Sequence, residues 1–237
     1  MFFRIFITTF VLLSLDMHAN YKNSDGRELN KSFRELLEWQ RNNKDPKISY
    51  IDLSNEWQDI DFKKADNYFI WVGHSTFLIK KNGITILTDP IFSDRASPFK
   101  NIGPKRLIPP ALNINDIPSI DYVTISHNHY DHLDINSLIQ ISEQYPSAIF
   151  LVPAGDLKLL KRKGINNVLE FDWWESVEYE NLTFTFTPVQ HWSKRGLFDR
   201  NKSLWGGWFM NFEDYSLYHA GDTGYSKDFI NIKERLG

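Results

Sequence analysis

Three histidines and one aspartate lie within six consecutive positions of this 237-residue chain, at His127, His129, Asp131 and His132. Imidazole nitrogens and carboxylate oxygens are ligands that suit Zn²⁺ and metals of similar softness. A metal site needs its ligands at fixed positions. We therefore expect a fold that holds the segment from His127 to His132 rigidly. The alternative is a polar turn whose histidines simply face water.

The flanking residues predict a strand before this cluster and a helix after it. The apolar run at 122–125 is typical of a strand, and residues 134–143 fit a helix with Asp134 as its N-cap. The cluster therefore lies on a strand-to-helix loop, where a rigid scaffold presents reactive groups to solvent.

The spacing within the cluster predicts that its side chains point in two directions. In extended backbone His127 and His129 point the same way, because side chains there repeat every two residues. Asp131 and His132 come after the chain turns. We therefore expect them to face a second ion close to the first.

Two more residues stand where predicted strands end. His191 follows the strand-like run 184–189, and Asp222 follows the run 217–221. Either residue alone would usually be structural. Beside the cluster, however, a third imidazole for one ion and a carboxylate able to bridge two ions are what a two-metal site still lacks.

The order of predicted elements indicates an α/β sandwich with sheets inside and helices outside. The pair Asn82-Gly83 is a strong hairpin signal between two of the strands. Strands are predicted over 68–72, 75–80, 84–88, 122–125, 148–152, 178–189 (a hairpin-like pair), 204–212 and 215–219, and a second helix over 156–163.

The first residues have the features of a secretory signal peptide, which we place at 1–19. A basic residue, Arg4, precedes an apolar run from Ile5 to Leu15, which is too short to span a bilayer comfortably. An uncleaved membrane anchor and a buried N-terminal element are the alternatives. We expect an exported protein, periplasmic or membrane-associated, if the signal acts, and a cytoplasmic one otherwise.

The remaining chain is divided into two parts. Residues 20–66 are predicted to be an N-terminal helical extension, in which Ser32 and Glu35 fit a capping box for a helix ending near Arg41. Residues 67–237 are predicted to be the domain that carries the metal site.

Composition limits the partners. The net charge of −3 gives no electrostatic basis for binding nucleic acid, and we expect none. The chain contains no cysteine, which excludes disulfides, thiolate ligands and a cysteine nucleophile.

The ligand cluster, His191 and the stretch Ala220-Gly221-Asp222-Thr223-Gly224 together resemble the metallo-β-lactamase superfamily. More narrowly, residues 67–237 resemble the N-acyl-phosphatidylethanolamine-hydrolysing phospholipase D family and its bacterial relatives. The stretches that carry this narrower resemblance are 71–79, 88–93, 103–110, 126–134, 189–195, 201–207 and 220–225.

The resemblance implies an αββα sandwich around a centre of two Zn²⁺ ions. The implied ligands are His127, His129 and His191 for the first ion, Asp131 and His132 for the second, and Asp222 as a bridge between them. The implied reaction is a phospholipase D type hydrolysis of N-acyl phosphatidylethanolamine to N-acylethanolamine and phosphatidate. Asp131 and Asp222 are the implied catalytic residues, which orient the attacking water or relay its proton.

One departure from the family pattern concerns the second ion. Family members continue past the position of Asp222 and supply a last histidine from there, whereas no histidine follows His219 in this sequence. His219 is a poor substitute, because three positions along a strand turn it away from Asp222. We therefore expect a sandwich that lacks part of its C-terminal half: a fragment, an interrupted reading frame or a degenerate copy.

Two alternatives to the lipid phosphodiesterase stay open. One is another hydrolase of the superfamily, such as a lactonase or a phosphodiesterase acting on soluble substrates. The other is an inactive truncated copy. The expected partner is a phospholipid or a membrane surface, and a homodimer is an open option.

Several residues have two interpretations each. His74 either lines the active-site floor or is structural, and Asp89 either orients a metal-binding imidazole or is a plain turn residue. The pairs Lys105-Arg106 and Lys194-Arg195 could meet lipid phosphate, but solvated surface charge is the simpler interpretation of each pair.

Overall fold

A computed structural model describes residues 20–28, 33–42, 61, 64–99, 101–179 and 181–237. The predicted signal peptide and the predicted N-cap at Ser32 lie outside these residues and stay predictions. Helix α1 (Phe33–Asn42) is present where the sequence predicts a helix. Among the described residues, no helix combines the length and apolar character needed to cross a membrane.

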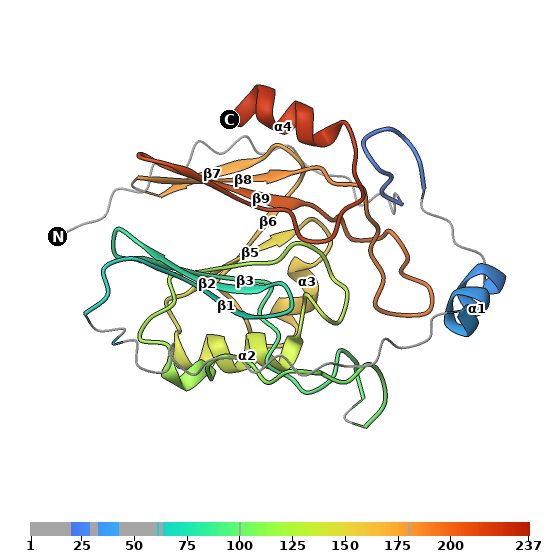
Figure 1. Cartoon of the computed structure of the whole chain (residues 1–237), viewed down its shortest axis with the longest axis horizontal. Helices are drawn as coiled ribbons and strands as arrows, with labels where there is room; N and C mark the ends of the chain where they lie inside the picture. Colours follow the sequence, from blue (N-terminus) through green and yellow to red (C-terminus); the bar gives the residue numbers. More distant parts are fainter. Residues whose placement is uncertain (1–19, 29–32, 43–60, 62–63, 100, 180) are drawn as a thin grey trace.

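Two β-sheets form the middle of the molecule (Figure 1). One sheet has the strand order β1-β2-β3-β4-β5-β6, and the other has the order β10-β9-β8-β7. The strands are β1 (Tyr68–Gly73), β2 (Thr76–Lys81), β3 (Ile84–Thr88), β4 (Tyr122–Thr124), β5 (Ile149–Pro153), β6 (Val168–Phe171), β7 (Ser176–Tyr179), β8 (Leu182–Thr187), β9 (Gly207–Phe212) and β10 (Ser216–His219).

Helices cover the outer faces of the two sheets. Helices α2 (Ile135–Gln144) and α3 (Leu157–Lys161) lie against the six-stranded sheet, and α4 (Asp228–Leu236) lies over the four-stranded sheet (Figure 1). A short 3-10 helix, η2 (Ile114–Asp116), lies near α2. The predicted α/β sandwich with helices outside is confirmed.

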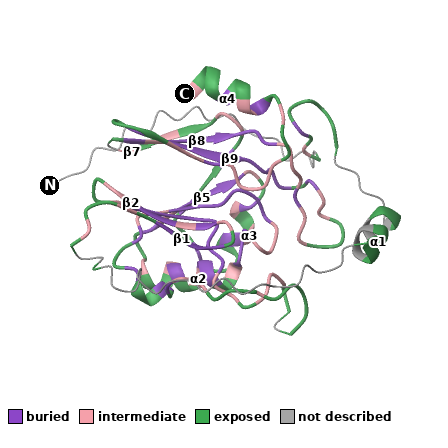
Figure 2. Ribbon diagram, viewed as in Figure 1, coloured by how far each residue is buried: buried purple, intermediate pink, exposed green. Residues whose placement is uncertain are grey.

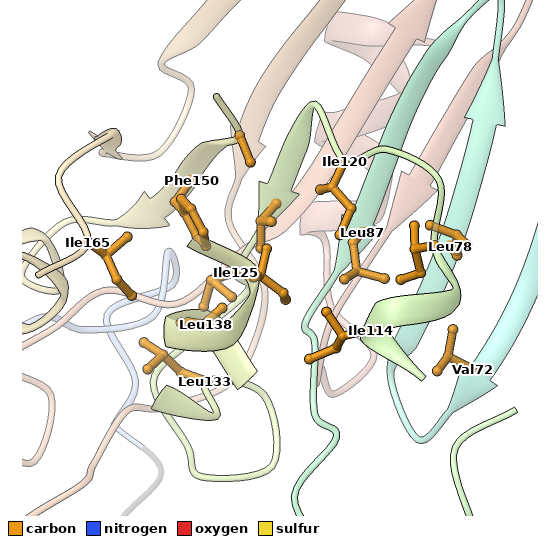
Figure 3. Close-up of a cluster of buried hydrophobic side chains, with 14 of the residues drawn as sticks. Val72, Leu78, Leu87, Ile114, Ile120, Ile125, Leu133, Leu138, Phe150 and Ile165 are labelled. Atoms are coloured by element: carbon orange, nitrogen blue, oxygen red, sulfur yellow. The ribbon is translucent and has the colours of Figure 1, made fainter. Parts of the chain in front are cut away.

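Alternation along the strands divides the core into two layers. In β2, Leu78 packs in the layer between the sheet and α2, whereas Ile79 packs between the two sheets. Leu87 and Ile86 of β3 divide in the same way, since successive side chains of a strand point to opposite faces. Figure 3 shows the helix-side layer, and Figure 2 shows buried residues along both sheets.

The topology places the ends of several strands at one edge. Strands β3, β4, β5 and β6 run parallel, and Thr88 of β3 pairs with Thr124 of β4. The residues after these two strands therefore emerge side by side, where ligands of parallel sheets usually bind. The predicted hairpin at Asn82-Gly83 joins β2 and β3, and both of its residues have positive φ, as a type I′ turn requires.

Candidate metal centre

The predicted ligand cluster lies on the loop between β4 and α2. The loop begins at the parallel edge of the sheet and turns tightly where Leu133 donates a backbone hydrogen bond to the His129 carbonyl at 2.8 Å. Asp134 caps α2 as predicted, because its side chain accepts from the Asn136 N–H. The helix therefore begins three residues after His132, the last predicted ligand on this loop.

Three imidazole nitrogens converge at one point of this edge. Nε2 of His127 lies 2.8 Å from Nδ1 of His129, and Nε2 of His191 lies 3.2 Å from both of these atoms. One proton can satisfy only one of these three contacts. Nitrogens that bind a tetrahedral Zn²⁺ at about 2.0–2.1 Å lie about 3.3 Å apart, so the spacing fits an ion at the centre.

The protonation of these three rings suits a metal ion. Burial lowers the pKa of His127 well below its ordinary value. Burial also lowers the pKa of His129 to about 4 and that of His191 to about 4. The rings are therefore neutral at pH 7, and each can present a lone pair without first losing a proton.

A second group of donors lies beside the first. Nε2 of His132 is buried without a hydrogen-bond partner and lies 3.3 Å from Asp222 Oδ1 and 3.8 Å from Asp131 Oδ2. The other Asp222 oxygen lies 3.8 Å from His191 Nε2. Asp222 thus stands between the two groups, with one oxygen toward each, as a bridging carboxylate must.

The second group differs from the first in charge. Burial would lower the pKa of His132, but the carboxylates of Asp222, Asp89 and Asp131 outweigh it and raise this pKa to about 10. The pKa of Asp131 is lowered to about 2, since His74 and His132 outweigh the opposing effect of burial. A cation at this position would displace the His132 proton and neutralise the carboxylates.

Asp89 connects the ligand loop to the second sheet through hydrogen bonds. Its buried Oδ2 accepts from Ser126 Oγ at 2.7 Å, His132 Nδ1 at 2.9 Å and His219 Nε2 at 2.9 Å, and its Oδ1 accepts from the Ser126 N–H at 2.7 Å. Burial would raise the pKa of Asp89, but His219 and His132 hold it well below its usual range. Asp89 therefore orients the His132 ring so that its Nε2 faces Asp222 and Asp131. The interpretation of Asp89 as a plain turn residue is thus wrong.

Ser126 extends the same network to His127. Its hydroxyl donates to Asp89, so it accepts from Nδ1 of His127 at 2.9 Å. This contact fixes the tautomer of His127 with its lone pair on Nε2, toward the other two imidazoles. His219 supports Asp89 instead of facing the ions.

Arg195 holds the ligand loop from the opposite side. Its Nη1 donates to the carbonyls of Asn128 at 2.8 Å and Leu133 at 2.7 Å, and its guanidinium lies 4.1 Å from the centre of the Tyr130 ring. The simpler interpretation of Arg195 as solvated surface charge is therefore wrong. The sequence does not indicate this contact, because Arg195 lies 67 positions from Asn128 and 62 from Leu133 and meets them only in the folded chain.

A pocket of about 790 Å³ opens beside the centre. His129 and Asp131 lie at its metal end, and Lys105, Arg106 and Lys194 contribute positive charge. The rest of its wall is largely apolar and includes Trp71, Ile91, Leu107, Ile108 and Trp192. The pocket can therefore hold a group that is partly anionic and partly apolar.

The structure brings all six predicted ligands to one edge of the sandwich. They form the groups His127, His129, His191 and His127, His132, Asp222, with Asp131 in a third group beside His132. The donor set fits two ions of the zinc type, since the nitrogens of His127, His129 and His191 are buried or half-buried and neutral at pH 7, and His132 would give up its proton to a bound cation.

A family model described as the beta-lactamase superfamily domain matches residues 85–237. The N-acyl-phosphatidylethanolamine-hydrolyzing phospholipase D 1 of Caenorhabditis elegans is 39% identical over 188 residues, which cover 75% of this chain and 53% of that protein. The mitochondrial N-acyl-phosphatidylethanolamine-hydrolyzing phospholipase D of Saccharomyces cerevisiae is 42% identical over 180 residues, which cover 73% of this chain and 38% of that protein. The chain thus spans about half, or less, of these relatives.

Solved structures agree on the fold. A possible metal-dependent hydrolase from Veillonella parvula superimposes with a TM-score of 0.57 at 21% identity, over 73% of this chain and 69% of that one. At this level of identity the likeness bears on the fold alone.

Proposed function

This chain belongs to the metallo-β-lactamase superfamily, and from that premise we propose that it is a two-zinc phosphodiesterase acting on N-acyl phosphatidylethanolamine-like lipids. The observation that carries the proposal is the pair of donor groups joined by Asp222 at the end of a mixed apolar and basic pocket. The relatives named as phospholipases D support the choice of substrate.

The bound ions would supply Lewis acidity toward the phosphate oxygens and an activated water. The protein residues would hold them in place: neutral His127, His129 and His191 on one side, and Asp131 with His132 on the other. Asp222 faces both groups, and its carboxylate stays ionised because the neighbouring His132 lowers its pKa. It can therefore orient the water and take its proton.

The proposed reaction is a hydrolysis that consumes only the lipid and one water molecule. The water oxygen bonds to phosphorus, and the bond between phosphorus and the ethanolamine oxygen breaks. One proton of the water passes by way of Asp131 or Asp222 to the leaving oxygen, which gives N-acylethanolamine and phosphatidate. Lys105, Arg106 and Lys194 would attract the phosphate, and the apolar wall would hold the lipid chains.

The test is hydrolysis of labelled N-acyl phosphatidylethanolamine in phosphatidylcholine vesicles by the zinc-loaded protein. We expect release of both products in equal amounts, and loss of that release in His127→Ala. A soluble bis-aryl phosphodiester and a lactone are assayed in parallel. Cleavage of these two substrates only would overturn the lipid assignment while leaving the hydrolase intact.

A further inference from the structure

We propose that His74 binds the second metal ion, so that this ion has two imidazoles and two carboxylates around it. The inference rests on the proposed two-metal centre and adds a ligand to it. The four donor atoms are Nε2 of His74, Nε2 of His132, and one oxygen each of Asp131 and Asp222.

The atoms of His74, Asp131 and His132 lie close enough together for one ion, and Asp222 Oδ1 lies 3.3 Å from His132 Nε2. His74 Nε2 lies 3.1 Å from Asp131 Oδ2, and the ligand atoms of His74, Asp131 and His132 all lie within 4.8 Å of one another. The rings of His74 and His132 meet edge to face with their centres 5.2 Å apart. Donors of one tetrahedral ion lie about 3.3 Å apart, which the contact between His74 and Asp131 nearly matches.

Two observations indicate an ion and not only a hydrogen bond. Nε2 of His132 is buried and has no hydrogen-bond partner, although its ring is completely withdrawn from solvent and faces this point. A hydrogen bond from His74 to Asp131 leaves that atom with only its charged contact to Asp222 Oδ1 at 3.3 Å. The carboxylates of Asp131 and Asp222 also converge here, and a divalent cation would balance both.

The backbone fixes His74 in position. His74 has φ +52°, in the left-handed region that few residues other than glycine adopt, and it follows a register shift between Trp71 and Gly73. The indole Nε1 of Trp71 donates to the His74 carbonyl at 2.8 Å. His74 lines the pocket, and a backbone held in this uncommon conformation suits a residue whose position matters.

The experiment measures the affinity of each ion by chelator competition in the full chain. His74→Asn is the main variant, because asparagine tolerates the left-handed backbone and keeps a side-chain amide that can donate to Asp131. We expect it to keep the first ion and to bind the second at least 10-fold more weakly. Asp94→Ala, which alters an exposed carboxylate of the same pocket, is the matched control and should keep both affinities.

A second variant tests whether residue 74 is a metal ligand or only a hydrogen-bond donor to Asp131. His74→Asp supplies a new anionic ligand but would repel Asp131, so it should recover part of the second ion's affinity only if residue 74 contacts the ion. X-ray absorption of the loaded protein should also show one imidazole fewer per ion pair in His74→Asn.

Two results would overturn the inference in distinguishable ways. If the parent and His74→Asn bind two ions with equal affinity, His74 is not a ligand and the two-metal centre stands. If the parent itself binds no second ion, the two-metal centre and the inference fail together.

Discussion

Substituting Asp89 by asparagine tests the network that holds the second group of donors. The carboxylate accepts four hydrogen bonds, three of them at Oδ2. An amide keeps the shape but replaces one acceptor by a donor. If its NH₂ replaces Oδ1 it faces the Ser126 N–H, and if it replaces Oδ2 it faces Ser126, His132 and His219, so either orientation sets donor against donor.

The expected magnitude follows from burial. Asp89 has no exposed surface, and removing one partner of a buried ion pair typically costs about 3–5 kcal/mol of unfolding free energy. Loss of a residue that orients a metal ligand typically weakens metal binding by about 10–100-fold. Urea unfolding of the chelator-treated protein measures the first effect, and zinc competition measures the second.

The control is Asp214→Asn, which removes an exposed carboxylate paired with Lys81 and should leave the unfolding midpoint close to that of the parent. A stability loss in Asp89→Asn below about 1 kcal/mol, with unchanged zinc affinity, would refute the argument, because a buried charge with this many partners cannot be neutralised at so small a cost.

Three further predictions concern the same edge. Arg195→Gln removes both hydrogen bonds to the ligand loop and should lower zinc affinity by about 10-fold, measured by chelator competition with Lys194→Gln as control. The folded pKa of His132 is raised to about 10, because carboxylates outweigh burial; stability from its protonated ring is therefore full below pH of about 6.5 and lost as pH rises toward about 10. Urea unfolding of the metal-free protein across that range should show this decline, and a flat profile would contradict it. Gly206→Ala should cost about 1–3 kcal/mol of unfolding free energy, since its Cβ would meet Phe186 at 2.5 Å; an unchanged melting temperature would speak against that packing.

The sequence was sufficient to predict features that depend on short-range patterns. The ligand cluster, the cap at Asp134 and the hairpin at Asn82-Gly83 each lie within a few consecutive residues, and the structure has them where they were predicted. Strand β6 was not predicted, because its four residues bury only the first and last side chains and give no alternation. Helix α4 was also missed.

Contacts between distant parts of the chain could not be predicted. Asp89 and His219 are 130 positions apart, and nothing local in either segment indicates that they meet. Asn23 likewise contacts the site from the predicted N-terminal extension, since its Oδ1 accepts from the His191 N–H at 3.0 Å. The contact between Asp89 and His219 depends on how the two sheets stack, which the alternation of single strands does not determine.

Anomalous X-ray scattering at the zinc edge, from crystals of the zinc-loaded protein, tests the central claim most directly. We predict two peaks about 3.5–4 Å apart, the spacing typical of two-metal sites, with one among His127, His129 and His191 and the other between Asp131 and His132. Well-ordered side chains at these positions with no anomalous peak between them would contradict the account.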